Sequence, residues 1–254
     1  MPKFIKYNTT PFPDALIREA DGLKRLAAAL EQAGETGPEA LRVPDVLQVS
    51  EEELTLPRIG TAPPTTAGSA ALGAGLARMH SQKMPCYGLD VDNMIGLSRQ
   101  KNTVMDDWGA FYVEYRLRPQ LMMIKDKPVR TEFESRLNAC DVALRDFLNA
   151  HCNHPSLLHG DLWAGNAMFD GRCPWLIDPA VYYGDREVDL ATTELFGGFA
   201  SAFYEAYDSV YPRTGVYGLK RPIYNLYPTL NHYNLLGAAY LGACRRNLAA
   251  FDRL

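Results

Sequence analysis

The sequence contains no hydrophobic run that approaches the roughly 18 residues needed to cross a membrane. Its first eight residues also lack the apolar core of a signal peptide. Lysine and arginine are scattered, with no basic run and no glycine-rich aromatic segment of the kind that binds nucleic acids. We therefore expect a cytoplasmic protein that binds neither membranes nor nucleic acid.

Cysteine is also scarce. The five cysteines are odd in number and dispersed, and no Cys-x-x-Cys pair occurs. This excludes a disulfide framework and favours free thiols. The segment 151–154, His-Cys-Asn-His, fits no standard zinc spacing, so we interpret it as a polar loop. With 254 residues, 47% hydrophobic composition and a net charge of −4, the chain has enough core for one or two domains.

One segment, residues 159–178, carries the side chains of a phosphoryl-transfer site. In protein kinases a catalytic Asp is followed about five positions later by a metal-binding Asn, and roughly a dozen residues further by a metal-binding Asp. Asp161, Asn166 and Asp178 keep this order and nearly this spacing. Because phosphoryl transfer depends mainly on alignment and charge neutralisation, three such side chains can carry most of it. We assign Asp161 as the catalytic acid/base and Asn166 and Asp178 as Mg²⁺ ligands.

Short apolar runs surround these residues. We predict strands at 156–158, 167–169 and 175–177, with Asp170-Gly171 as the turn between the last two. The two metal ligands would then lie at facing ends of one hairpin. Hard oxygen ligands of this kind suit Mg²⁺ that is shared with nucleotide phosphates.

The stretch 159–166, His-Gly-Asp-Leu-Trp-Ala-Gly-Asn, resembles the signature of the fructosamine kinases (ketosamine 3-kinases), relatives of the aminoglycoside and choline kinases. The resemblance runs from about residue 3 to the C-terminus. It implies a two-lobed, protein-kinase-like α+β fold and ATP-dependent, Mg²⁺-dependent phosphorylation of the C3 hydroxyl of a fructosamine or ribulosamine, which is a deglycation activity. Further segments that resemble the family are 102–108, 116–121, 178–184, 187–191, 196–199 and 230–234.

The resemblance also implies roles for residues outside the motif. Lys6, on a strand, would hold the ATP phosphates and pair with Glu19 on a helix. Trp163 would stack on the sugar or amine, and His232 would contact the open-chain sugar. The alternatives are a solvent-facing lysine, a surface glutamate, a packed indole and a structural histidine. We expect Asp189 to brace the catalytic loop through hydrogen bonds.

The hydrophobic periodicity predicts strands at 3–7, 46–49 and 54–59 and helices at 16–30, 67–80, 108–121 and 130–148. Residues after 190 are expected to be mostly helical. We predict a long loop over 81–105, in which Asp90 to Asn93 are turn residues rather than a metal site. Residues 1–60 would form a partial N-lobe that binds ATP, and residues 61–254 a mainly helical C-lobe for catalysis and substrate binding.

The sequence departs from the family in one respect. Only five residues precede Lys6, so the glycine-rich hairpin that covers the ATP phosphates is absent. We expect an N-terminally truncated small lobe with an exposed strand edge. Either the true start lies upstream, or this is a shortened form with weakened ATP use. Two other functions stay open: a kinase of another small alcohol, such as an aminoglycoside or choline, and a catalytically weakened nucleotide-binding protein. The physiological ketosamine and the oligomeric state are not predicted.

Overall fold

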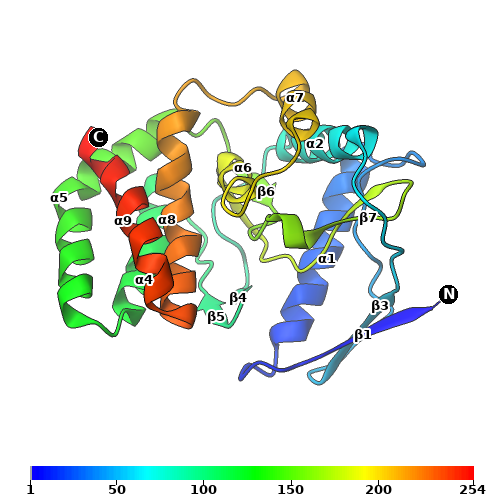
Figure 1. Ribbon diagram of the computed structural model, residues 1–254, viewed down its shortest axis with the longest axis horizontal. Helices are drawn as coiled ribbons and strands as arrows, with labels where there is room; N and C mark the ends of the chain where they lie inside the picture. The colour runs from blue at the N-terminus through cyan, green and yellow to red at the C-terminus, as the bar shows by residue number, and fades with distance from the viewer. Residues whose placement is uncertain (1) are drawn as a thin grey trace.

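A three-stranded antiparallel sheet and one long helix form the N-terminal part of the fold (Figure 1). In the computed structural model, which describes residues 2–254, strand β3 (Glu53–Pro57) is central and pairs with β1 (Lys3–Tyr7) and β2 (Gln48–Val49). Helix α1 (Ala15–Gln32) packs one apolar face inward. The buried side chains of that face follow the spacing of an amphipathic helix: Leu16, Ala20, Leu23, Leu26 and Leu30.

Strand β1 lies at one edge of this sheet among the described residues. Phe4, Ile5 and Tyr7 are exposed on it, in agreement with the exposed strand edge that we predict. The strand at 3–7 and the helix at 16–30 are confirmed. The second predicted strand shortens to two residues, and the third begins and ends slightly earlier than predicted.

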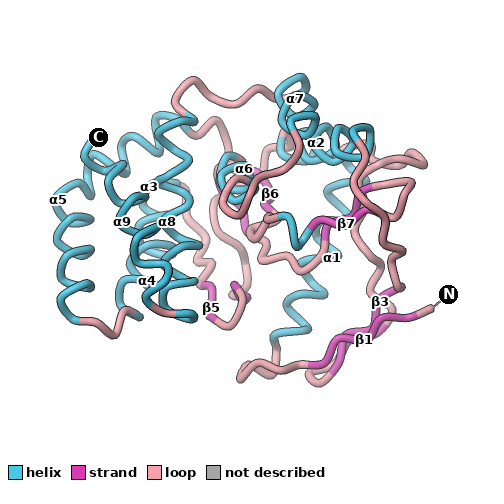
Figure 2. Tube along the Cα trace, in the orientation of Figure 1, coloured by secondary structure: helices cyan, strands magenta, loops and turns pink. Residues whose placement is uncertain are grey.

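The rest of the chain is dominated by helices (Figure 1; Figure 2). Its helices are α2 (Thr66–His80), α3 (Trp108–Tyr112), α4 (Arg118–Met123), α5 (Lys127–His151), α6 (Glu187–Thr193), α7 (Ser201–Val210), α8 (Tyr217–Leu236) and α9 (Leu241–Leu248), with 3₁₀ turns at Ala164–Asn166, Ala238–Tyr240 and Ala249–Arg253. Helix α2 packs against α7, α8 packs against α6 and α9, and α3 packs against α5. A π-helical turn at Val113–Leu117 joins α3 to α4. The helices that the periodicity predicts are present, with the one at 108–121 divided by this turn, and the residues after 190 are mostly helical as expected.

Two short strand pairs lie between these two parts. Strand β6 (Ser156–Leu158) pairs with β9 (Tyr182–Gly184), and β7 (Ala167–Phe169) pairs with β8 (Pro174–Leu176). Strands β6, β7 and β8 are those that the apolar runs predict, with β8 displaced by one residue, whereas β9 was not predicted. The β7–β8 hairpin therefore separates the predicted metal ligands, as expected.

The prediction of a long loop over residues 81–105 is wrong in part. This segment contains a second small hairpin, β4 (Asn93–Ile95) and β5 (Ser98–Gln100). Its inward-facing side chains include the polar Asn93, Ser98 and Gln100, all buried. Because these positions are polar, the pattern lacks the hydrophobic alternation that marks a strand in a sequence.

Among residues 2–254, no helix combines the length and the hydropathy that a membrane crossing requires. The boundary between the two lobes near residue 60 stays a prediction.

The packing of α2 on α7 depends on a glycine. A Cβ atom at Gly73 would lie 2.1 Å from the carbonyl oxygen of Phe203. We predict that Gly73→Ala lowers the free energy of unfolding by about 1–3 kcal/mol, because the two helices must separate to admit the methyl group. Urea denaturation measures this change.

Gly218→Ala is the matched control. Gly218 also lies in a helix, but no atom beyond the helix's own nearby backbone stands within 4 Å of the added Cβ. Alanine there should leave stability unchanged or raise it by up to about 1 kcal/mol. Equal effects of the two substitutions would contradict the packing argument.

Candidate active site

The catalytic loop begins where strand β6 ends and passes close to the segment that follows β8. Gly160 adopts a φ of +83°, and a Cβ there would lie 2.1 Å from the carbonyl oxygen of Ala180. The amide of Ala180 donates to the carbonyl oxygen of His159 at 2.8 Å. The His159 ring contacts the carbonyl oxygen of Ile177 at 2.9 Å. Residues 159–161 and 177–180 are therefore held together by one backbone hydrogen bond and by the His159 ring, and a glycine at position 160 permits the close approach.

A buried carboxylate on the interior side holds the same loop in place. Asp189 on α6 accepts the backbone N–H groups of His159 at 2.7 Å and of Gly160 at 2.9 Å. His80, at the end of α2, lies 3.2 Å from the same carboxylate through Nε2 and is fully buried. This confirms the bracing role predicted for Asp189 and gives His80 a structural role.

Asp161 and Asn166 lie side by side on this loop. The Asn166 amide donates to the carbonyl oxygen of Asp161 at 2.8 Å and to its carboxylate at 3.2 Å. With its amide nitrogen used in this way, the Oδ1 atom of Asn166 has no hydrogen-bond partner among residues 2–254. The local turn thus fixes the orientation of the carboxylate and of one amide oxygen.

Asp178 stands at the end of the β7–β8 hairpin. The amide of Ile177 donates to the carbonyl oxygen of Asn166 at 3.0 Å, so Asp178 and Asn166 are close across the hairpin base. Asp178 has a φ of +53°, and no other non-glycine residue among those described has a positive φ. A non-glycine residue in this left-handed region is uncommon, and such residues cluster at active sites and ligand-binding positions.

Lys6 connects this hairpin to the N-terminal sheet and to α1. Its Nζ atom lies 2.7 Å from Oε2 of Glu19 and 2.9 Å from Oδ1 of Asp178. The structure therefore places the predicted Lys6–Glu19 ion pair directly beside the predicted metal ligand. Three residues that lie up to 172 positions apart meet at one ammonium group.

Burial and charge shift the acidities of these groups. Burial raises the pKa of Asp161 to about 7, with the Asn166 hydrogen bond acting in the opposite direction. Burial also raises the pKa of Glu19 to about 7 against the attraction of Lys6. Burial disfavours the charged form of Lys6, but Glu19 and Asp178 outweigh it, so the pKa of Lys6 lies above its usual value. A carboxyl with a pKa near neutrality is suited to act as a general base.

These side chains line one cleft of about 300 Å³. This volume is at the lower end of the range for small-molecule sites. The cleft is also lined by residues that the sequence did not single out, from the loop after β1 and from the β4 strand and its turn: Asn8, Thr9, Thr10, Met94 and Gly96. No motif marks these residues, and only the fold brings them to the site.

An aromatic row leads away from the catalytic loop. Trp163 lines the cleft and is partly exposed, and its ring lies edge-on to Phe196 at 6.1 Å between centroids. Phe196 lies 5.1 Å from His232, which in turn lies 5.0 Å from Tyr240. His232 Nδ1 contacts the carbonyl oxygen of Pro228 at 2.7 Å, so one ring nitrogen is used within α8. Trp163 therefore lines the cleft directly, whereas the Phe196 ring lies between Trp163 and His232.

The donor set fits a magnesium ion that is shared with nucleotide phosphates. The free Oδ1 of Asn166 and the carboxylate of Asp178 are hard oxygen donors at the base of one hairpin. Mg²⁺ commonly takes only one or two protein carboxylates or amides and completes its octahedron with water and phosphate oxygens. The roles of all the predicted site residues stay predictions.

Comparison with known proteins identifies the family to which the chain belongs. Residues 2–251 match the family model described as fructosamine kinase. The chain is 36% identical over 253 residues to a Vibrio vulnificus protein named a probable ketoamine kinase, covering 96% of this chain and 83% of that protein. The chain belongs to the fructosamine kinase family. It is therefore a phosphotransferase.

Solved structures agree with this membership. A Thermobifida fusca protein named a candidate fructosamine-3-kinase has 31% identity and a TM-score of 0.82, covering 100% of this chain and 86% of that one. The aminoglycoside phosphotransferase APH(4)-Ia, at 15% identity and a TM-score of 0.62, covers 98% of this chain and 86% of that structure. The latter similarity shows the fold alone, and it confirms the predicted kinase-like α+β class.

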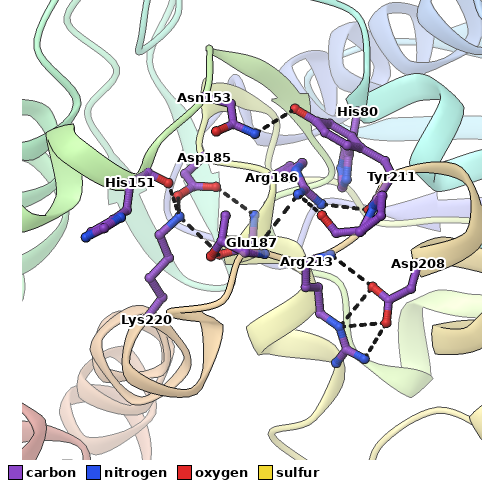
Figure 3. Close-up of polar contacts among 12 residues, drawn as sticks. His80, His151, Asn153, Asp185, Arg186, Glu187, Asp208, Tyr211, Arg213 and Lys220 are labelled. Atoms are coloured by element: carbon purple, nitrogen blue, oxygen red, sulfur yellow. Dashed lines mark hydrogen bonds and ion pairs between the residues drawn. The ribbon is translucent and has the colours of Figure 1, made fainter.

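This fructosamine kinase family member also has a buried ionic cluster, formed by Lys220, Asp185 and Glu187 (Figure 3). Lys220 on α8 is fully buried and lies 2.6 Å from Asp185 and 3.0 Å from Glu187. Glu187 also accepts the backbone amide and the hydroxyl of Thr214. Burial alone would lower the pKa of Lys220, but the two carboxylates outweigh it and raise that pKa. The cluster ties α8 to the segment that leads into α6 and Asp189.

We predict that Lys220→Met lowers the free energy of unfolding by about 3–5 kcal/mol. The buried Asp185 would lose its cation, and Glu187 would be left with the longer ion pair to Arg186 at 3.9 Å. Thermal or chemical denaturation measures this loss of stability.

The neighbouring Arg221 is the control, since it pairs with Glu194 at an exposed position. Arg221→Met should change stability by no more than about 1 kcal/mol. A Lys220→Met protein as stable as the parent would contradict this account of the cluster.

Proposed function

We propose that this chain transfers the γ-phosphoryl group of ATP to the C3 hydroxyl of a ketosamine, either a fructosamine or a ribulosamine. The observation that carries the proposal is the convergence of Lys6, Asp161, Asn166 and Asp178 on one cleft beside Trp163. The ketosamine class comes from the family, and the names of the related proteins support it.

Asp161 is proposed as the catalytic residue. Its carboxylate orients the acceptor hydroxyl and accepts the proton as the hydroxyl oxygen bonds to the γ-phosphorus. The bond between that phosphorus and the β–γ bridging oxygen breaks, and ADP leaves. The Asn166 hydrogen bond to the carboxylate holds Asp161 in one orientation for this step.

Lys6 is proposed to bind the ATP phosphates. Glu19 holds the ammonium group in position, as the ion pair at 2.7 Å indicates. Asn166 and Asp178 would hold Mg²⁺, which when bound neutralises phosphate charge. Because Lys6 contacts Asp178 directly, the proposed phosphate-binding ammonium group and the proposed Mg²⁺ ligand lie next to each other.

Trp163 is proposed to stack on the sugar or on the amine of the acceptor, and His232 to contact the open-chain sugar from the far side of Phe196. A ketosamine 3-phosphate is unstable and sheds its sugar, so the proposed role is deglycation. A cytoplasmic location stays a prediction.

The first test measures ADP release by the purified chain with Mg-ATP, with and without a synthetic fructosamine or ribulosamine. We predict acceptor-dependent turnover that falls by about 100-fold or more in Asp161→Asn, because the amide cannot accept the proton. The variant should still bind nucleotide. Turnover with aminoglycosides or choline, but not with ketosamines, would contradict the proposed acceptor. Full activity of Asp161→Asn would contradict the proposed base.

The pH profile tests the same residue. Because the pKa of Asp161 is raised to about 7, the carboxylate that accepts the proton is lost as the pH falls below 7. We predict that kcat/KM declines on the acidic side with a midpoint near pH 7. Glu19→Gln removes the other carboxyl with a pKa of about 7 and should leave this limb in place. A midpoint near pH 4 would contradict the shift.

A further inference from the structure

The β4–β5 hairpin lies between the helical part of the molecule and helix α1 (Figure 1; Figure 2). Its two strands, Asn93–Ile95 and Ser98–Gln100, are separated by a turn at residues 96–97. Along β5 the side chains alternate, with Ser98 and Gln100 buried and Arg99 exposed between them. Alternate residues of a strand point to opposite faces, so one hairpin can contact two partners.

The buried face is fixed to the segment that follows Asp178. The Asn93 amide donates to the carbonyl oxygen of Val181 at 2.8 Å, and the Gln100 amide donates to the carbonyl oxygen of Ala180 at 3.0 Å. Both side chains are almost fully buried. Hydrogen bonds of this kind are costly to leave unmade once the groups are buried.

Helix α8 holds the same face. The Ser98 hydroxyl donates to Asn231 at 2.7 Å, and the Tyr227 hydroxyl donates to Gln100 at 2.9 Å. The hairpin is therefore anchored at several points to the catalytic part of the molecule. Its exposed face, which carries Arg99, is therefore held in a defined position.

Arg99 projects from that other face to the start of α1. Its two terminal nitrogens lie 3.0 Å and 2.9 Å from the two carboxylate oxygens of Asp14. Its guanidinium carbon lies 4.9 Å from the ring centroid of Phe12. Two parallel hydrogen bonds from a planar guanidinium define an orientation as well as a distance.

Asp14 directly precedes α1, and Glu19 lies in the second turn of the same helix. A second ion pair joins α1 to the segment before β4, since Arg25 lies 2.8 Å from Asp90. The two pairs hold the same side of α1 at two points. Glu19, whose carboxylate pairs with Lys6, lies between these two points along the helix.

We propose that Arg99 is a positioning residue, which holds the start of α1 through Asp14 so that Glu19 faces Lys6. This proposal rests on the proposed role of Lys6 in nucleotide binding. Arg99 touches no reacting group and acts only through the helix. The pair is partly exposed, with 45% of the Arg99 side chain and 26% of the Asp14 side chain accessible, so salt should weaken its effect.

The test measures the affinity for a non-hydrolysable ATP analogue with Mg²⁺ by isothermal calorimetry. We expect Arg99→Ala and Asp14→Ala each to weaken binding by about two- to fivefold at low salt, and the difference from the parent to shrink at high salt. Arg245→Ala is the matched control. Arg245 makes a comparable two-nitrogen pair with Glu132, at 3.1 Å and 2.7 Å, outside the cleft. This control should bind the analogue as the parent does.

A double-mutant cycle separates pairing from a general loss of structure. Asp14 also contacts Arg18 at 3.2 Å, so Asp14→Ala removes more than the Arg99 pair. The double variant Asp14→Ala/Arg99→Ala should bind the analogue no more weakly than Asp14→Ala alone, because the two substitutions remove the same pair. Affinity equal to the parent in Arg99→Ala, or a double variant whose loss equals the product of the two single losses, would overturn the proposal.

Hydrogen exchange of the ligand-free protein gives a second readout that needs no nucleotide. Amides in the first two turns of α1 should exchange faster in Arg99→Ala and at the parental rate in Arg245→Ala. Identical exchange in both variants would overturn the proposal.

A parent that binds the analogue but phosphorylates no ketosamine would contradict the proposed acceptor alone, and would leave the comparison of Arg99 variants intact.

Discussion

The candidate site depends on one ammonium group, that of Lys6, which joins three separate parts of the chain. It bonds to Glu19 on α1 and to Asp178 at the end of the β7–β8 hairpin, and it is carried by the edge strand β1. Each of these contacts is an ion pair in a partly enclosed cleft, where charges interact more strongly than in water. If Lys6 were removed, Glu19 and Asp178 would face the proposed phosphate site without a cation, and β1 would lose its ion pair with the end of the β7–β8 hairpin.

The elements around this group explain why the arrangement holds without a bound ligand. The catalytic loop is tied to the segment after Asp178 by a backbone hydrogen bond from Ala180 to His159, and Gly160 allows the close approach. Asp189 fixes the loop from inside the protein, and the Lys220 cluster fixes the segment that carries Asp189. Preorganisation of this kind lowers the reorganisation needed when charge moves during phosphoryl transfer. The raised pKa of Asp161 is a consequence of the same enclosure.

The sequence predicted the parts of the site that lie close together along the chain. Asp161, Asn166 and Asp178 belong to one loop and hairpin, so their spacing nearly determines their geometry. The Lys6–Glu19 pair followed only from the family resemblance, since nothing local marks either residue. The β4–β5 hairpin was missed because its buried side chains are polar, and their partners are backbone carbonyls and α8 side chains far away in sequence. For the same reason the pairing of Arg99 with Asp14, 85 positions apart, has no signal in the sequence.

The most direct measurement of the central claim is the position of the phosphate in the product. The chain would be incubated with Mg-ATP and a small synthetic fructosamine, and the product followed by ³¹P and ¹H nuclear magnetic resonance. The account predicts a phosphate ester on the C3 hydroxyl, formed together with one ADP and followed by release of the amine. A phosphate on another hydroxyl, or ADP release that does not depend on the fructosamine, would contradict it.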